Sequence, residues 1–367
     1  MSLPYFPHEI RLEGVKGVGT IQLTLEPQQQ VYCLIGTNGV GKTKLLESLL
    51  QMIIIGCAII PEQYHYQEFA AVLSEAILDQ SIRLTFGKNK HSSFVVGGNI
   101  PFKPFCFIGS QNRGLIQGQP KIAPIGSFAD RMMGHWQVIF SAMKSNFSSL
   151  GMTENIGSWF VSRAMASNPY QKKEDNRQIE IETVLKLLNQ IDRRVDPEFL
   201  EVTGEPRVFI KIEDQKRELS QLSSGFTSIL KIIQSIVSGY GYFTNEVQLQ
   251  HVAGLVLIDE IESHLHNQWL VKIIPMLKQL FPNTIFIVTT HSPIVLTQLK
   301  HGEAYRLQRD DDGVVRSHLI NHPDKAAFVD LLNDAFGVDL NQQKLDRISA
   351  SDQQHVKAQL LDWLSEE

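Results

Sequence analysis

The chain has 367 residues, of which 43% are hydrophobic and 20% are charged, a composition that is ordinary for a globular protein with a large apolar core. Its 39 acidic and 34 basic side chains give a formal net charge of −5. The chain as a whole therefore lacks the basic excess of most nucleic-acid binders, and only a local patch such as Arg193 and Arg194 stays open.

The first third of the sequence is predicted to be rich in β-strands. β-Branched and aromatic residues gather between turn residues at 8–12, 20–25, 31–35, 81–86, 93–96 and 105–108. Helices are predicted over 42–51 and 68–78. Together these elements predict a β-rich N-terminal lobe over residues 1–126.

A glycine-rich turn joins the strand at 31–35 to the helix that begins at Lys42. Its glycines let the backbone wrap closely, so that main-chain N–H groups and the helix N-terminus converge on a phosphate. Lys42 would bridge the β- and γ-phosphates of a nucleotide, and the Thr43 hydroxyl would coordinate Mg²⁺. The predicted phosphate loop consists of Gly36, Thr37, Asn38, Gly39, Val40, Gly41, Lys42 and Thr43.

The spacing of apolar residues changes after residue 126. Apolar residues at helical spacing predict a helical insertion over 127–206, with helices at 129–147, 154–166 and 178–191. Strands are then predicted, each leading into a helix, at 208–212, 255–258 and 284–288. This alternation is typical of a largely parallel, buried sheet, so the expected fold is an α/β phosphate-loop NTPase.

The remaining elements complete a lobe over 207–322 and a helical tail over 323–367. Strands predicted at 303–307 and 314–319 flank an acidic turn with Gly313, which we interpret as the tip of a hairpin rather than a metal site. The tail is polar on one side and carries no recognisable motif.

Two carboxylates, Asp259 and Glu260, follow the predicted strand 255–258, at the edge where ligands bind in open α/β sheets. Asp259 would bind Mg²⁺, and Glu260 would orient the attacking water and accept its proton. His291 follows the next strand, where an imidazole can hydrogen-bond the γ-phosphate. Taken alone, two acids can simply turn into solvent and His291 can be a loop residue, but the phosphate loop favours the catalytic interpretation.

Ser223, Ser224 and Gly225 precede a helix predicted over 227–237. Hydroxyls and a glycine at a helix N-terminus can bind an anion, although serine is also a common helix cap. Because the phosphate of this chain is already assigned to the loop 36–43, a functional nest here would serve a phosphate bound to another subunit.

The cysteines and the apolar runs indicate the cellular compartment of the protein. Cys33, Cys57 and Cys106 lie far apart in apolar stretches, which is typical of buried thiols in a reducing compartment. The longest apolar run, 49–60, is shorter than the roughly 18 to 20 residues of a membrane helix. The N-terminus shows no secretion signal, so we expect a cytoplasmic protein without a membrane partner.

Four motifs occur in a fixed order: the loop 36–43, Leu-Ser-Ser-Gly-Phe at 222–226, Ile-Asp-Glu-Ile-Glu-Ser-His-Leu-His at 258–266, and Thr-Thr-His-Ser-Pro at 289–293. In this order they resemble the ABC-type ATPases. The resemblance is to the RecF/SMC-like branch of stand-alone ATPases, labelled AAA-family and related to those of OLD, retron and other phage-defence systems.

The resemblance implies a head-to-tail dimer or a higher homo-oligomer. Two ATP molecules would lie between the phosphate loop of one subunit and the turn formed by Ser223, Ser224 and Gly225 of the other. The family also has a glutamine between its two lobes that senses Mg²⁺ and the attacking water, and Gln111 has the matching place. Unlike transporter ATPases, the chain has Ser224 and Phe226 in the signature, and His266 stands in place of an aspartate, so its role is not assigned.

The expected function is that of an ATP-hydrolysing conformational switch. Family analogy places it in phage defence, where it would control a separate effector such as a nuclease, because no nuclease constellation is visible in the chain. A DNA-repair ATPase of the RecF kind, with nucleic acid as its partner, remains the alternative. The departures from the transporter pattern disfavour a transporter subunit.

Overall fold

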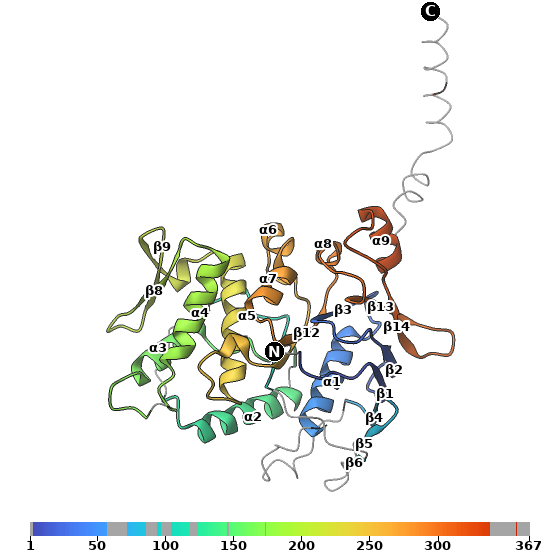
Figure 1. Ribbon diagram of the computed structural model, residues 1–367, viewed down its shortest axis with the longest axis horizontal. Helices are drawn as coiled ribbons and strands as arrows, with labels where there is room; N and C mark the ends of the chain where they lie inside the picture. Colours follow the sequence, from blue (N-terminus) through green and yellow to red (C-terminus); the bar gives the residue numbers. More distant parts are fainter. Residues whose placement is uncertain are drawn as a thin grey trace, which may run out of the picture.

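The computed structural model describes residues 3–56, 72–85, 94–96, 104–116, 124–144, 147–172, 174–337 and 357. Within them lie an eleven-stranded sheet and a three-stranded sheet (Figure 1). The strands of the larger sheet are β1 (Glu9–Val15), β2 (Gly19–Thr24), β3 (Val31–Ile35), β4 (Glu75–Leu78), β5 (Ile82–Thr85), β6 (Phe94–Val96), β7 (Phe105–Ile108), β11 (Gly254–Ile258), β12 (Thr284–Thr289), β13 (Ala304–Arg309) and β14 (Val315–Leu319).

The order of strands in the larger sheet is β6-β5-β4-β1-β2-β14-β13-β3-β12-β11-β7. The strands β13, β3, β12, β11 and β7 pair in parallel, whereas β1, β2, β4, β5 and β6 pair antiparallel. Parallel neighbours end at the same edge, so the chain leaves β3, β7, β11 and β12 on one side of the sheet. The predicted α/β class, with a β-rich N-terminal part, is confirmed.

Helices complete the architecture, and the three predicted in the insertion are observed as α2, α3 and α4. The division of the chain into four parts stays a prediction. The helices are α1 (Lys42–Gly56), α2 (Phe128–Lys144), α3 (Ile156–Ala166), α4 (Gln178–Ile191), α5 (Ser224–Gly241), α6 (Asn267–Leu270), α7 (Ile273–Leu280), α8 (Pro293–Leu296) and α9 (Phe328–Phe336).

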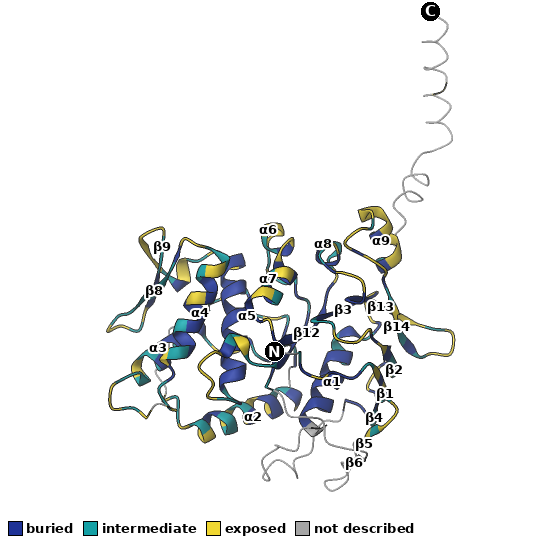
Figure 2. Cartoon of the chain, in the orientation of Figure 1, coloured by how far each residue is buried: buried dark blue, intermediate teal, exposed yellow. Residues whose placement is uncertain are grey.

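The central strand β3 contributes side chains to two apolar cores, one on each face of the sheet. Val31, Cys33 and Ile35 belong to the apolar core that contains α3, α4, α5 and α7, while Tyr32 and Leu34 belong to the core that contains α1 and α2. Side chains of a strand alternate between its two faces, so a strand covered on both sides is apolar throughout. Figure 2 shows α1 and α5 buried along most of their length.

The strand Val208–Ile212 (β9) does not enter the parallel sheet, which corrects one prediction. It pairs with β8 (Val195–Val202) and β10 (Gln215–Glu218) in a separate antiparallel sheet. The reason is the turn after β9, where Glu213 and Asp214 have φ of 51° and 60°. Two successive residues with positive φ make the tight hairpin turn that returns the chain beside its own strand instead of into a helix.

The helix predicted over 68–78 is also wrong in its described part. Residues 75–78 form β4, which pairs with β1 and β5; residues 68–71 lie outside the described residues. Ala76 and Leu78 are buried while Glu75 and Ile77 are half-buried. This period of two is that of a strand, and four residues are too few to distinguish it from a helix in the sequence.

The predicted hairpin around the acidic turn and the predicted burial of Cys33 and Cys106 are confirmed. β13 and β14 pair antiparallel around the acidic turn, where Arg316 forms ion pairs with Asp310 and Asp312 at 2.8 and 2.6 Å. Cys33 and Cys106 are buried and free, and Cys57 lies outside the described residues. Among the residues that the structure describes, none of the helices is both long and apolar enough to cross a membrane.

Candidate functional site

The predicted phosphate loop connects β3 to α1 in a conformation that requires glycine. Gly39 and Gly41 have φ of 80° and 110°, a region that side chains rarely adopt. A Cβ atom on Gly36 would lie 2.6 Å from the main-chain oxygen of Leu307, and one on Gly41 would lie 2.8 Å from Val18. The loop is therefore wrapped tightly against β13 and the β1–β2 turn.

Lys42 lies over this loop. Its Nζ donates to the carbonyl oxygens of Gly36 and Thr37 at 2.8 and 3.1 Å, and the residue is buried. Burial lowers the pKa of Lys42, while the carboxylates of Asp259 and Glu260 oppose that shift. The ammonium is thus held inside the turn that would cradle a phosphate, at the position the motif requires.

The next residue, Thr43, contacts Asp259. The Thr43 Oγ1 lies 3.0 Å from Asp259 Oδ2, and Thr289 Oγ1 donates to Asp259 Oδ1 at 2.7 Å. Mg²⁺ prefers oxygen ligands and is commonly held by one or two carboxylates together with substrate phosphates. A hydroxyl and a buried carboxylate beside a phosphate loop fit that ion.

Glu260 occupies a strained turn at the end of β11. Its φ is 47°, which is uncommon for a residue with a side chain, and such strain collects at functional sites. Its N–H donates to Thr289 Oγ1 at 2.8 Å, and Ser263 Oγ donates to Glu260 Oε2 at 3.0 Å. Thr289 therefore contacts both predicted carboxylate residues and sets their relative positions.

His291 is exposed in the turn that follows β12. This turn is held by Glu262, a residue for which the sequence predicted no role. The Glu262 carboxylate accepts from the main-chain N–H of His291 at 2.6 Å and from Thr290 Oγ1 at 2.7 Å. Because β12 lies between β3 and β11, this turn stands between the phosphate loop and Glu260. The only feature of the sequence that could have indicated a role for Glu262 is its position, two residues after Glu260.

The signature turn begins α5, and both interpretations of it are compatible with its geometry. Ser223 is the N-cap, with Oγ accepting from the N–H of Phe226 at 3.3 Å, while Ser223 and Ser224 remain exposed. A Cβ atom on Gly225 would lie 2.9 Å from the His266 ring. His266 thus packs against the signature glycine, which gives this residue a structural place that the sequence left open.

Gln111 is exposed in the loop that follows β7, and its main-chain N–H donates to the oxygen of Ser148 at 3.1 Å. Its role as a sensor stays a prediction. From the same loop, the Arg113 side chain reaches the end of β11, where its Nη1 donates to the carbonyl oxygen of Glu260 at 2.7 Å.

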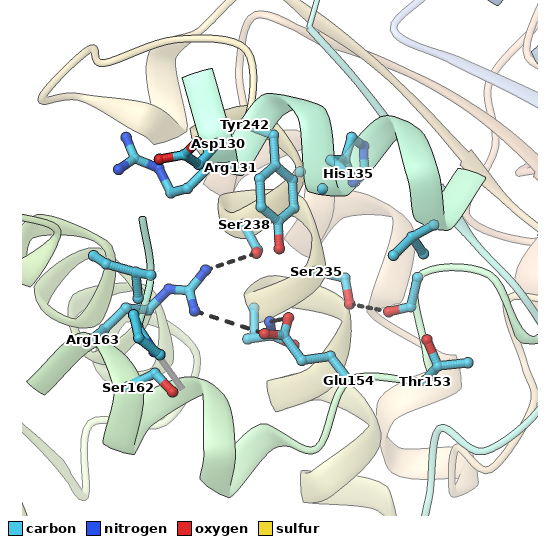
Figure 3. Close-up of a pocket in the computed structure, with 17 residues that line it drawn as sticks. Asp130, Arg131, His135, Thr153, Glu154, Ser162, Arg163, Ser235, Ser238 and Tyr242 are labelled. Atoms are coloured by element: carbon cyan, nitrogen blue, oxygen red, sulfur yellow. Dashed lines mark hydrogen bonds and ion pairs between the residues drawn. The ribbon is translucent and has the colours of Figure 1, made fainter. Parts of the chain in front are cut away.

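A cavity of about 480 Å³ lies apart from these residues, between α2, α3 and α5, and its lining residues all lie outside the four motifs. Figure 3 shows Arg163, Glu154, Ser238 and Tyr242 around it. Arg163 donates to Ser238 Oγ at 3.3 Å and lies 3.7 Å from the Glu154 carboxylate. The cavity therefore belongs to the helical part of the chain and lies apart from the predicted nucleotide site.

His135, on the wall of this cavity, should make stability depend on pH. Its Nε2 is buried without a hydrogen-bond partner among the described residues, and its ring stacks on Tyr242 at 4.3 Å between centroids. Burial lowers the pKa of His135 to about 3, whereas an unfolded histidine titrates near ~6.5. As the pH falls below ~6.5, the unfolded chain gains a proton that the folded chain does not, so the free energy of unfolding falls.

The test is urea unfolding of a His135→Phe variant in a series of buffers. We expect its free energy of unfolding to fall less steeply than that of the wild type between about pH 6.5 and 5. His251 is exposed, so His251→Phe is the control and should retain the wild-type slope. An unchanged slope in His135→Phe would contradict the prediction.

Comparison with known proteins finds similarity to an AAA-domain family and to probable ATPases. Residues 157–297 match the family described as "AAA domain, putative AbiEii toxin, Type IV TA system". Septu protein PtuA of Bacillus thuringiensis is 24% identical over 323 residues, which cover 84% of this chain and 77% of that protein. The retron Ec83 probable ATPase of Escherichia coli is 37% identical over 111 residues, or 28% of this chain.

The chain spans 36% of a second Septu protein PtuA, from Bacillus mycoides, and 20% of the retron Ec83 protein. Among solved structures, an SMC head bound to the C-winged helix domain of ScpA aligns with a TM-score of 0.48 and 11% identity, covering 86% of this chain and 98% of that one. The matched family segment contains three of the four motifs. The resemblance predicted from these motifs is thereby confirmed as far as these matches extend: the chain is similar to AAA-domain proteins and to retron-associated probable ATPases.

Proposed function

We propose that the chain binds and hydrolyses ATP with Mg²⁺. The observation that carries this proposal is the contact between Thr43 and Asp259 beside the phosphate loop, with Glu260 next to it in a strained turn. Bound Mg²⁺ would neutralise charge on the phosphates, held by Thr43 and Asp259. Lys42 would bind the β- and γ-phosphates, and Glu260 would orient a water and accept its proton.

We further propose that the active site is completed by a second copy of the chain. Ser223 and Ser224 are exposed at the N-terminus of an eighteen-residue helix, where main-chain N–H groups and the helix dipole favour an anion. The phosphate loop of the same chain already supplies its own helix N-terminus at α1. Closure of two heads on ATP and opening after hydrolysis would make the molecule a switch.

The names of the relatives support a role in phage defence, in which this switch controls a separate effector protein. In the part of the chain that the structure describes, no specific observation favours nucleic acid as the partner. Of the basic residues considered as a local patch, Arg194 forms ion pairs with Asp192 and Glu213 at 2.8 and 3.1 Å. A guanidinium already paired with two carboxylates contributes little to a phosphate-binding surface.

Mixing two inactive variants tests the shared site. Lys42→Ala should abolish nucleotide binding to the loop, and Ser224→Arg should block the signature turn, so each variant alone should lose ATP hydrolysis. An equimolar mixture should recover about one quarter of the wild-type rate, because half of the dimers then contain one intact site of two. Ser81→Arg, an exposed serine in the β4–β5 turn, is the control and should keep full activity. A mixture that recovers nothing would contradict the shared site.

A further inference from the structure

Arg113 is a fully buried arginine that binds main-chain oxygens at the catalytic edge of the sheet. Its exposed fraction is 0%. Nε donates to Gly109 O at 2.9 Å, Nη1 to Glu260 O at 2.7 Å, and Nη2 to Ile108 O at 3.3 Å and also to Asp259 O. One guanidinium therefore joins the end of β7 to the end of β11.

Lys231 is a second buried cation of the same kind, on α5. It stands seven residues after Ser224, and its Nζ donates to Asn112 O at 2.7 Å and to Leu115 O. These two oxygens lie on either side of Arg113 in the loop after β7. Lys231 thus ties the signature helix to the loop, and Arg113 ties the same loop to Asp259 and Glu260.

Burying the two cations Arg113 and Lys231 costs free energy of desolvation. A buried cation without a carboxylate in contact has a desolvation cost that apolar residues of the same volume would avoid. Burial lowers the pKa of Arg113 to about 10 and that of Lys231 to about 8, which reflects that cost. What the two side chains supply in return is a set of directional bonds to main-chain oxygens. Those of Lys231 reach the loop after β7, and those of Arg113 reach the ends of β7 and β11.

The bonds hold the strained residue itself. The main chain of Glu260, whose φ is 47°, is held on both sides. Its N–H donates to Thr289 Oγ1, and its carbonyl oxygen accepts from Arg113 Nη1. α5 also contacts the turn after Glu260, because Ser228 Oγ lies 3.4 Å from His264 O. A shift of α5 along its axis would therefore reach Glu260 through main-chain contacts, without passing through the nucleotide.

We propose that Lys231 and Arg113 are positioning residues that couple the N-terminal turn of α5 to Glu260 through residues 112–115. This inference rests on the proposed ATP hydrolysis at a site shared between two copies. When α5 meets the phosphate bound to a second copy, the loop and Arg113 set Glu260 for catalysis. When α5 is unengaged, as in a single chain, Arg113 and Thr289 hold Glu260 in its strained turn without the shift that sets it for catalysis, and premature hydrolysis is limited.

The test uses the full-length chain and the variant Lys231→Met. We expect the turnover number to fall about 10- to 100-fold, as for a catalytic group displaced by about 1 Å. The dissociation constant for ATP and dimer formation should stay within about twofold of the wild type, because neither cation contacts the phosphate loop. Lys231→Arg, which retains the charge and the donors, should restore part of the turnover. Gln234→Met, a buried polar residue one turn further along α5, is the matched control and should hydrolyse ATP normally.

A second measurement does not depend on hydrolysis. Amide hydrogen exchange is recorded with and without a non-hydrolysable ATP analogue, at residues 223–228 and 259–264. In the wild type both segments should be protected by the analogue; in Lys231→Met only 223–228 should be. Arg113→Lys should give the same pattern.

The outcomes separate the two proposals. A wild-type chain that binds the analogue but hydrolyses no ATP would overturn the proposed function, while the exchange pattern would still decide the coupling. Protection of 259–264 in Lys231→Met equal to that in the wild type would overturn the coupling. A parallel loss of analogue binding and of thermal stability in this variant would also overturn it, because the lysine would then have only a structural role.

Discussion

Replacing Glu260 with glutamine should lower the turnover number of ATP hydrolysis by about 10²- to 10⁴-fold, the contribution typical of a general base. The amide has the size of the carboxylate and can still accept a hydrogen bond from Ser263 Oγ, which lies 3.0 Å from Glu260 Oε2. It cannot accept a proton from water. Asp259, rather than Glu260, contacts Thr43, so the residues proposed to hold Mg²⁺ stay intact and ATP binding should persist.

The measurement combines phosphate release with nucleotide affinity and light scattering. Glu260→Gln should bind ATP as tightly as the wild type and should accumulate as dimers when ATP is added, because the closed state is no longer emptied by hydrolysis. Glu262→Gln is the control from the same turn: it weakens the bonds to Thr290 and His291 but leaves the proposed base in place. Wild-type turnover in Glu260→Gln would remove the catalytic assignment, and loss of ATP binding would indicate a structural role.

The parts of the site that could be predicted are those that a short sequence determines locally. The loop 36–43 is recognisable because glycine is needed at Gly39 and Gly41 for positive φ, whatever the rest of the fold. The strands before it and before Asp259 are apolar throughout because helices cover both faces of the sheet. The contact between Thr43 and Asp259 then follows from the parallel order of the strands.

The parts that could not be predicted depend on contacts between distant segments. Arg113 and Lys231 donate to main-chain carbonyl oxygens. Every residue has such an oxygen, so the sequence does not indicate which residues will accept these bonds. The strand β4 has only four residues, and its pairing with β1, about 65 positions earlier in the chain, decides its conformation. In the sheet of β8, β9 and β10, only β9 was predicted as a strand. β8 carries three acidic residues and a proline, and three of the four residues of β10 are charged, so neither shows the apolar pattern of a strand.

Replacing Glu180 with alanine should lower the free energy of unfolding by about 3–5 kcal/mol, the effect of breaking a buried ion pair. Glu180 lies on α4 and is buried between two arginines: its carboxylate is 2.5 Å from Arg163 Nε and 2.7 Å from Arg177 Nε. Burial acts to raise the pKa of Glu180, but the two guanidinium groups lower it below its ordinary value. Without the carboxylate, Arg177 would lose its ion-pair partner, and Arg163 would keep only the more distant Glu154 carboxylate at 3.7 Å.

The cause can be separated from a simple loss of packing. If unpaired charge is the reason, a variant that also carries Arg163→Met and Arg177→Met should recover much of the lost stability, because apolar side chains avoid the desolvation cost. Arg163 also lies over the Trp159 ring at 4.4 Å, so some of the loss should remain. Glu182→Ala on the same helix removes an exposed pair with Lys186 at 3.5 Å and should cost no more than about 0.5 kcal/mol. A urea midpoint for Glu180→Ala equal to that of Glu182→Ala would show that the buried cluster does not stabilise the packing of α3 and α4 beside α5.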